Sequence, residues 1–200
     1  MNSQSSNGQF KDTLLRLWQD GYVVVRHLLS ENSIKRLSSY VLQRWESGAI
    51  STSDTQVPNT PALYGDPVMD KLLADLVPTV ERISGRQVFP TYSYMRLYKT
   101  GDVLAKHTDR QACEISLSLC VAAVPSEGWP LWIESRLGIV GIELIPGDAV
   151  LYLGMDCAHW REKFAGTRAL QVFLHYVDQN GPYQSWRFDK RACLAHMTAA

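Results

Sequence analysis

Apolar residues in the first 87 positions recur mainly at the three- and four-residue spacing of amphipathic helices. The first stripe, at 10–18, ends before a glycine and an apolar strand at 22–25. A second stripe follows Ser30, which can cap a helix, and a third follows Asp66 and Pro67, which suit the cap and first turn of another. We therefore expect residues 1–87 to form a mainly helical support.

Residues 47–64 interrupt this helical pattern. They are rich in Ser, Thr and Pro and show no sustained hydrophobic period. A loop of this length within a compact domain is usually either functional or disordered. We therefore expect a mobile lid over an active site, with a disordered surface insertion that has no function as the alternative.

In the second half of the chain, polar and apolar residues alternate as they do in half-buried β-strands. Tyr94, Arg96 and Tyr98 fall on one face of such a strand, because side chains separated by one position point the same way. Residues 88–178 are therefore predicted to form a β core, and 179–200 a C-terminal extension. The expected fold class is mainly β with supporting α-helices.

Composition bounds the class of protein. A chain of 200 residues with 46% hydrophobic content can bury one sizeable core, so we expect residues 1–200 to form a single domain. Its 20 basic and 20 acidic residues balance, which disfavours nucleic acid as a partner. The four cysteines lack Cys-x-x-Cys spacing, which argues against a structural zinc site. No apolar run approaches membrane-spanning length and no signal peptide is recognisable, so we expect a cytoplasmic protein without a membrane partner.

His107, Asp109 and His159 are the candidate metal ligands. Two imidazoles and one carboxylate form the ligand set that holds Fe(II) on one face and leaves the opposite positions open. Because one residue separates His107 from Asp109, both point the same way from an extended strand, and the third ligand must come from another strand. Taken alone, the first two also fit an ordinary surface pair and His159 a structural histidine. Their order and sequence context favour a metal site.

Three short motifs supply that context. The stretch before the first histidine matches the pattern Tyr-x-x-Gly-x-x-(apolar)-x-x-His-x-Asp at Tyr98, Gly101, Leu104, His107 and Asp109. A Pro-Gly-Asp-Ala turn at 146–149 precedes the distal histidine, and a Gly-Thr-Arg element that ends at Arg168 follows it. Together the motifs resemble the prolyl-hydroxylase-like branch of the Fe(II)/2-oxoglutarate-dependent dioxygenases, over roughly residues 88–178.

This resemblance implies a double-stranded β-helix, a jelly-roll or cupin-like barrel, with the N-terminal helices packed on its outside. It implies Fe(II), 2-oxoglutarate and O₂ as cofactor and co-substrates, with His107, Asp109 and His159 as the catalytic iron ligands. It further implies that Arg168 binds the far carboxylate of 2-oxoglutarate and that Tyr98 assists. An arginine suits this role because its planar guanidinium donates two parallel hydrogen bonds to a carboxylate. Arg168 lies one residue closer to the distal histidine than the resemblance leads us to expect.

Four residues are candidate substrate contacts. Tyr94 and Arg96 are expected on the cavity face of their strand, while Arg110 and Trp160 each follow a metal ligand directly. The two arginines favour a small polar or amino-acid-like substrate that bears a carboxylate or phosphate. His175 falls on the strand face opposite that of residue 168, so we expect it to point outward or to be satisfied by packing.

The resemblance implies oxidation of an unactivated substrate C–H bond, usually hydroxylation, coupled to conversion of 2-oxoglutarate to succinate and carbon dioxide. Three alternatives stay open: a peptidyl or prolyl hydroxylase, a cupin-like metalloenzyme that does not use 2-oxoglutarate, and a non-catalytic jelly-roll binding module. Arg168 and Tyr98 count against the second alternative, because such an enzyme needs no carboxylate clamp. The complete ligand set counts against the third, because buried His and Asp side chains have little use without an ion.

Overall fold

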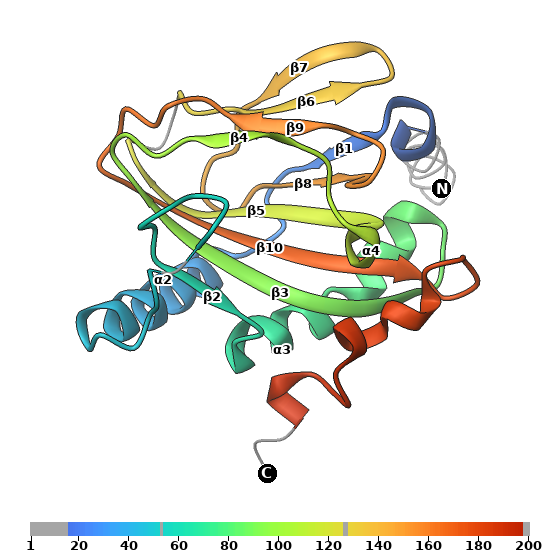
Figure 1. The fold of residues 1–200 in the computed structure, drawn as a ribbon, viewed down its shortest axis with the longest axis horizontal. Helices are drawn as coiled ribbons and strands as arrows, with labels where there is room; N and C mark the ends of the chain where they lie inside the picture. Colours follow the sequence, from blue (N-terminus) through green and yellow to red (C-terminus); the bar gives the residue numbers. More distant parts are fainter. Residues whose placement is uncertain (1–15, 53, 126–127, 198–200) are drawn as a thin grey trace, which may run out of the picture.

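The computed structural model describes residues 16–52, 54–125 and 128–197, and within these ranges the strands form two antiparallel sheets (Figure 1). The larger sheet contains six strands in the spatial order β1 (Tyr22–Val25), β8 (Ala149–Tyr152), β5 (Ile115–Val124), β10 (Arg168–Asp178), β3 (Val88–Lys99) and β2 (Ala62–Tyr64). The smaller sheet contains four, in the order β4 (Leu104–His107), β9 (His159–Arg161), β6 (Leu131–Ser135) and β7 (Gly138–Ile142). The sheets face each other, which confirms the expected double-stranded β-helix.

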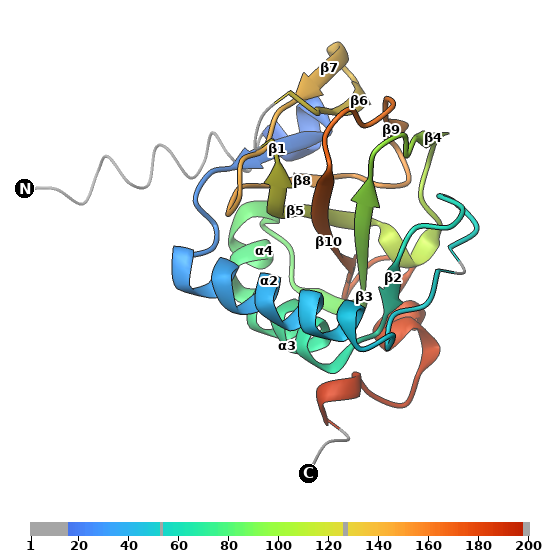
Figure 2. The same cartoon turned by 90° about the vertical axis from the view of Figure 1, so that its left-hand side faces the viewer.

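Helices α2 (Glu31–Glu46), α3 (Pro67–Asp75) and α4 (Val77–Ser84) cover the face of the larger sheet that points away from the smaller one, as Figure 2 shows. Ser30 and Asp66 begin the first two helices, because their side chains accept hydrogen bonds from backbone N–H groups of the first turn. Both caps are as the sequence predicts. Residues 16–20 are also helical, whereas the rest of the stripe at 10–18 lies outside the described residues.

The two faces of the larger sheet are buried in different clusters. The face toward the helices carries Met95 and Leu97 of β3 and Val172 of β10, all in the main hydrophobic cluster. The opposite face contributes Tyr98 and Phe173 to a second cluster between the sheets. Alternation along each strand therefore separates a face that packs on helices from a face that lines the barrel interior.

Several elements lie outside the predicted core at 88–178. Strands β1 and β2 precede it in sequence yet form the two edges of the larger sheet. After β10, the short 3-10 helices η2 (Gln184–Lys190) and η3 (Ala195–Met197) contact β3 and α3 respectively. Within the core, a third 3-10 helix, η1 (Gln111–Cys113), precedes β5. In the described part of the chain, no helix combines the length and apolar character needed to cross a membrane.

Candidate active site

The structure brings His107, Asp109 and His159 together at the end of the smaller sheet. His107 ends β4 and His159 begins β9, and the two residues lie directly opposite each other in the antiparallel ladder. The Nε2 atoms of His107 and His159 lie 3.7 Å and 3.6 Å from Asp109 Oδ1. One ligand atom from each of the three residues falls within 4.8 Å of the others, so the group is compact enough to hold one metal ion.

Backbone carbonyl groups orient both imidazoles. His107 Nδ1 lies 2.8 Å from the carbonyl oxygen of Ala105, and His159 Nδ1 lies 3.0 Å from that of Cys157. A carbonyl oxygen only accepts, so each Nδ1 carries the proton and donates. Each Nε2 then presents a lone pair toward Asp109, which is the arrangement that a metal-binding histidine needs.

Burial controls the charge state of the three groups. It lowers the pKa of His159 to about 4 and, together with the neighbouring His159, lowers the pKa of His107. It also raises the pKa of Asp109 to about 6. The imidazoles are therefore neutral near pH 7, the form that binds a metal, and a divalent cation between the ligands favours the ionised carboxylate.

A cavity of about 330 Å³ opens above the three groups. Tyr94, Arg96 and Arg110, three of the four candidate substrate contacts, line it. Four further lining residues, Asp54, Thr55, Gln56 and Tyr64, come from the segment at 47–64. Other side chains of the wall are largely aromatic and include Tyr92, Phe173 and His175. The site is thus a small cavity with a polar and aromatic wall.

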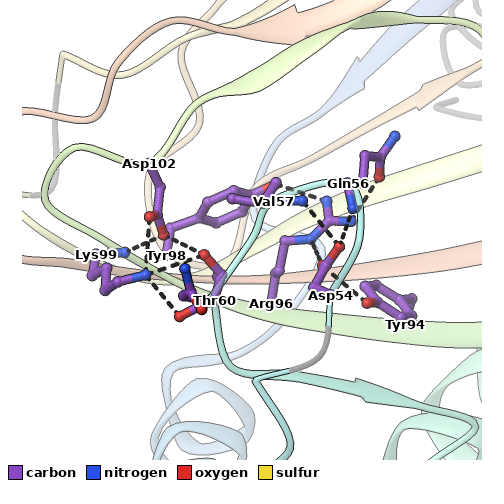
Figure 3. A network of polar contacts seen from close by, with 10 residues as sticks. Asp54, Gln56, Val57, Thr60, Tyr94, Arg96, Tyr98, Lys99 and Asp102 are labelled. Atoms are coloured by element: carbon purple, nitrogen blue, oxygen red, sulfur yellow. Dashed lines mark hydrogen bonds and ion pairs between the residues drawn. The ribbon is translucent and has the colours of Figure 1, made fainter.

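Each arginine of the cavity wall is already paired with a carboxylate. Arg96 forms a buried ion pair with Asp54 and also donates to Gln56 Oε1 at 2.7 Å and to the Tyr98 hydroxyl at 3.0 Å (Figure 3). Arg110 donates two hydrogen bonds of 2.7 Å to Asp189 in η2. The charges expected to receive an anionic substrate are therefore neutralised by loop and C-terminal residues.

No protein-family model matches this chain, and no curated protein matches it in sequence. Solved structures do match over most of its length. A prolyl-4-hydroxylase from Pseudomonas putida superimposes with a TM-score of 0.70 at 18% identity, covering 84% of this chain and 98% of the other. SnoN, an α-ketoglutarate-dependent epimerase from nogalamycin biosynthesis, has a TM-score of 0.73 at 14% identity, with coverages of 86% and 82%. HygX from Streptomyces hygroscopicus, solved with nickel, 2-oxoglutarate and hygromycin B, has a TM-score of 0.67 at 14% identity. The match covers 85% of this chain and 88% of the other.

The chain has the fold of the Fe(II)/2-oxoglutarate-dependent oxygenases. At 13–18% identity the likeness concerns the fold, including that of a prolyl hydroxylase, as the sequence motifs led us to expect. What this oxygenase fold does in the present chain depends on the side chains that surround the three candidate ligands.

Ser116 of β5 supports the candidate ligand Asp109. Its hydroxyl lies 2.9 Å from Asp109 Oδ2 and 2.9 Å from His175 Nδ1. The hydroxyl has one proton, and a carboxylate only accepts, so Ser116 donates to Asp109 and accepts from His175. These two hydrogen bonds, from His175 to Ser116 and from Ser116 to Asp109, occupy Asp109 Oδ2 and leave Oδ1 facing the two imidazoles. Ser116 is not among the candidate site residues expected from the sequence, although its alternation with the apolar Ile115 and Leu117 is typical of a strand with one polar face.

We expect Ser116→Ala to weaken iron binding about 10- to 100-fold, the range typical of groups that orient a metal ligand. Ser118→Ala is the matched control, because Ser118 lies on the same strand, is buried and has no hydrogen-bond partner for its hydroxyl among the described residues. Equilibrium dialysis against Fe(II) without oxygen measures both variants. Equal iron affinities in the two variants would show that Ser116 does not position Asp109.

Trp160, the fourth candidate substrate contact, does not reach the cavity. It lies between His159 and Arg161 on β9, and these two neighbours point inward, so Trp160 points to the outer face. There it stacks on Trp132 with a ring separation of 6.3 Å and donates to Glu162 Oε1 at 2.9 Å. Adjacency in sequence to a metal ligand was therefore a misleading criterion for this residue.

Arg168 and His175 lie on opposite faces of β10, as expected, but the faces are exchanged. Opposite residues in an antiparallel pair share a face, and Ala169 lies opposite the inward Tyr98. Arg168 is consequently exposed and absent from the cavity wall, whereas His175 lines it. The segment after the distal histidine is one residue shorter than expected, and a shift of one residue moves a strand side chain to the other face.

Arg161 is an inward-pointing basic residue that sequence reasoning missed. It is only 2% exposed, lies two positions after His159 on β9, and points to the same side of the strand. The two-residue period that paired His107 with Asp109 also pairs His159 with Arg161. That signal was present in the sequence.

Proposed function

We propose that the chain is an Fe(II)- and 2-oxoglutarate-dependent oxygenase that acts on a small polar or amino-acid-like substrate. The observation that carries this proposal is the convergence of His107, Asp109 and His159 on one side of a small cavity within an oxygenase fold. The donor set fits iron, because two neutral imidazoles and a carboxylate leave the remaining positions of the metal open. When bound, iron and 2-oxoglutarate supply the oxidation of a substrate C–H bond by O₂.

The cavity wall supports a small substrate. Its volume of about 330 Å³ lies at the lower end of the range for ligand pockets. Asp54 and Arg96 form an ion pair in the wall, so a substrate that carries both an ammonium and a carboxylate group would match both of their charges. The hydroxyl groups of Tyr64, Tyr92 and Tyr94 add polar contacts. A peptidyl or prolyl substrate is the second candidate, because the fold is shared with a prolyl-4-hydroxylase.

A substrate screen tests this proposal. Purified protein supplied with Fe(II), ascorbate and 2-oxoglutarate should form succinate faster when the correct amino acid, polar metabolite or proline-containing peptide is added. Succinate and oxidised substrate should appear in equal amounts, and a chelator should stop both. The proposal fails if substrate turnover continues without 2-oxoglutarate, a result that would favour a cupin-like metalloenzyme of another class.

We also infer that the segment at 47–64 acts as the lid of this site. Two buried contacts hold its described part on the barrel: the Asp54–Arg96 ion pair, and a 2.7 Å hydrogen bond from the Thr60 hydroxyl to Asp102 Oδ2 (Figure 3). Closure over the cavity excludes water from the reacting atoms, a role that active-site loops often have.

Asp54→Asn is expected to uncouple the reaction. Asparagine can still accept hydrogen bonds from the backbone N–H groups of Gln56 and Val57, but it leaves the buried Arg96 without a counter-ion. Breaking one side of a buried pair costs about 3–5 kcal/mol, so the closed segment should be strongly destabilised. Succinate formed per oxidised substrate should rise several-fold, with iron binding unchanged. Asp75→Asn, in an exposed pair with Lys71, is the control; unaltered coupling in both variants would leave the surface-insertion alternative.

A further inference from the structure

Arg161 is a buried cation without a carboxylate partner. It donates to the carbonyl oxygen of Trp129 at 2.8 Å and to Gln171 Oε1 at 3.3 Å, and both acceptors are neutral. Its Nε atom is buried and has no hydrogen-bond partner in the part of the chain that the structure describes. Arg96 and Arg110, by contrast, each form an ion pair with an aspartate. Among the described residues, Arg161 is thus a buried guanidinium whose counter-charge is missing from the protein.

An uncompensated buried guanidinium is energetically unfavourable. It stays protonated at any physiological pH, and desolvation of such an ion is a large penalty that only an opposite charge or a full set of hydrogen bonds offsets. A neutral carbonyl and an amide supply part of that set. A bound anion would supply the rest, and a carboxylate matches the planar fork of donors best.

The position of Arg161 relative to the candidate iron ligands defines the kind of anion. Two residues of an extended strand span about 7 Å, so Arg161 lies deeper along β9 than His159 by roughly that length. It also lies opposite Leu104 of β4 in the ladder that joins His107 to His159. An anion that bridges the metal ligands and Arg161 must therefore carry two acidic or chelating ends on a short chain.

Tyr98 marks the same place from the larger sheet. The Tyr98 ring packs edge-on against Trp129 with centroids 4.9 Å apart, and the Arg161 guanidinium lies 4.5 Å from the centroid of that same Trp129 ring. The hydroxyl of Tyr98 already accepts from Arg96 and keeps its own proton available for a second partner. Arg161 and Tyr98 thus converge on one region of the barrel interior from opposite sheets. Neither side chain lines the cavity itself; this region adjoins the cavity at Leu104, a wall residue that lies opposite Arg161 in the ladder of β4 and β9.

We propose that Arg161, and not Arg168, binds the C5 carboxylate of 2-oxoglutarate, with the Tyr98 hydroxyl as a second donor. This inference rests on the proposed function, since it assigns a residue to the co-substrate of that reaction. It gives the buried guanidinium its missing counter-charge, and it moves the carboxylate anchor from β10, where Arg168 points outward, to β9.

Binding measurements with two 2-oxo acids test the assignment. Mn(II)-loaded protein without oxygen is titrated calorimetrically with 2-oxoglutarate and with 2-oxopentanoate, which has the same five-carbon chain but no C5 carboxylate. The wild-type protein should prefer 2-oxoglutarate by about 30-fold or more, the factor expected for one buried charge pair. Arg161→Met should bind 2-oxoglutarate as weakly as 2-oxopentanoate, with affinity for 2-oxopentanoate unchanged. Arg168→Met should keep the wild-type preference.

Thermal unfolding without ligand distinguishes an anion-binding Arg161 from a purely structural one. Replacement of a structural arginine would lower the melting temperature. Methionine is apolar and similar in length, so removal of an uncompensated charge should leave the melting temperature equal or higher. A lower melting temperature in a folded Arg161→Met protein would indicate a structural role and overturn the assignment. If Arg161→Met does not fold, Arg161→Gln keeps hydrogen-bonding capacity without the charge and should lose the preference for 2-oxoglutarate in the same way.

The outcomes separate this inference from the proposed function. A wild-type protein that binds both 2-oxo acids equally overturns the proposed function itself. A wild-type preference that survives in Arg161→Met overturns only the role of Arg161. If the preference disappears in Arg168→Met instead, the anchor is Arg168, and β10 must rearrange when the co-substrate binds.

Discussion

His159→Ala is expected to abolish iron binding and all 2-oxoglutarate turnover. The imidazole is almost fully buried, and its orientation is set by the hydrogen bond from Nδ1 to the Cys157 carbonyl, so the substitution removes one of the three candidate ligands from a preorganised site. His107→Ala should have the same effect because it removes the ligand on the opposite strand. Metal analysis of the purified variants, together with succinate formation, measures both losses.

His27→Asn is the control for these histidine variants. His27 lies in the turn after β1, is exposed, and has a positive φ of 52° that asparagine tolerates. Its contact with Asp148 is made by the backbone N–H group and so survives the change. This variant should keep one iron per chain and full activity. Stoichiometric iron and full activity in the His107 and His159 variants would refute the metal assignment.

Gly154→Ala is expected to damage the site nearly as severely, although glycine contributes no ligand. A Cβ atom at this position would overlap Asp109 Oδ2 and would lie 2.5 Å from the Cys113 carbonyl oxygen and 2.6 Å from Ser116 Oγ. Real Cβ atoms do not approach so closely, and a backbone carbonyl is a poor candidate to move. Asp109 must therefore shift, and the Gly154 carbonyl that accepts from the Asp109 N–H must shift with it.

The expected loss in iron affinity is about 100-fold or more, because displacement of a ligand exceeds the 10- to 100-fold typical of its supporting groups. Gly141→Ala is a suitable control, since the three atoms nearest to its Cβ would belong to the Trp132 ring, the first at 3.0 Å, on the outer face of the smaller sheet. Iron titration of both variants tests the expectation, with circular dichroism as a check of folding. Wild-type iron affinity in Gly154→Ala would mean that the space around Asp109 is less constrained than the structure indicates.

The relative placement of side chains within one strand was predictable from the sequence. The alternation of Tyr94, Arg96 and Tyr98 puts them on one face of β3, and the structure has that arrangement because an extended strand has a two-residue period. His107 and Asp109 also lie together as their spacing predicts, although β4 ends at His107 and Asp109 follows the strand. The two-residue period does not indicate which face of a strand points inward.

Which face of β10 points inward can be determined only from its pairing with a neighbouring strand. Ala169 lies opposite Tyr98, and this register turns Arg168 outward and His175 inward. No property of Arg168 itself indicates that register, because the hydrogen bonds that fix it join β10 to β3 and β5. Trp160 was misplaced for a related reason, since the residue next to an inward-pointing ligand on a strand must point outward.

The ion pairs between residues far apart in the chain could not be predicted from the sequence either. Asp54 meets Arg96 across 42 positions, and Asp189 meets Arg110 across 79. Charged residues are common in loops, and their spacing in sequence carries no sign of such a partner. Only the folded barrel, which brings the segment at 47–64 and the C-terminal η2 to the same opening, reveals them.

Each of these two ion pairs joins a residue in or beside a barrel strand to a residue of a connecting segment, and the two parts can change independently in evolution. The candidate iron ligands and Arg161 belong to barrel strands or lie directly beside them, whereas Asp54 and Asp189 lie outside the β-strands. Insertions or substitutions near Asp54 or Asp189 would change the shape and the charge of the cavity entrance but would leave the candidate iron ligands in place. A single ancestral barrel could in this way acquire new substrates by exchange of its loops alone.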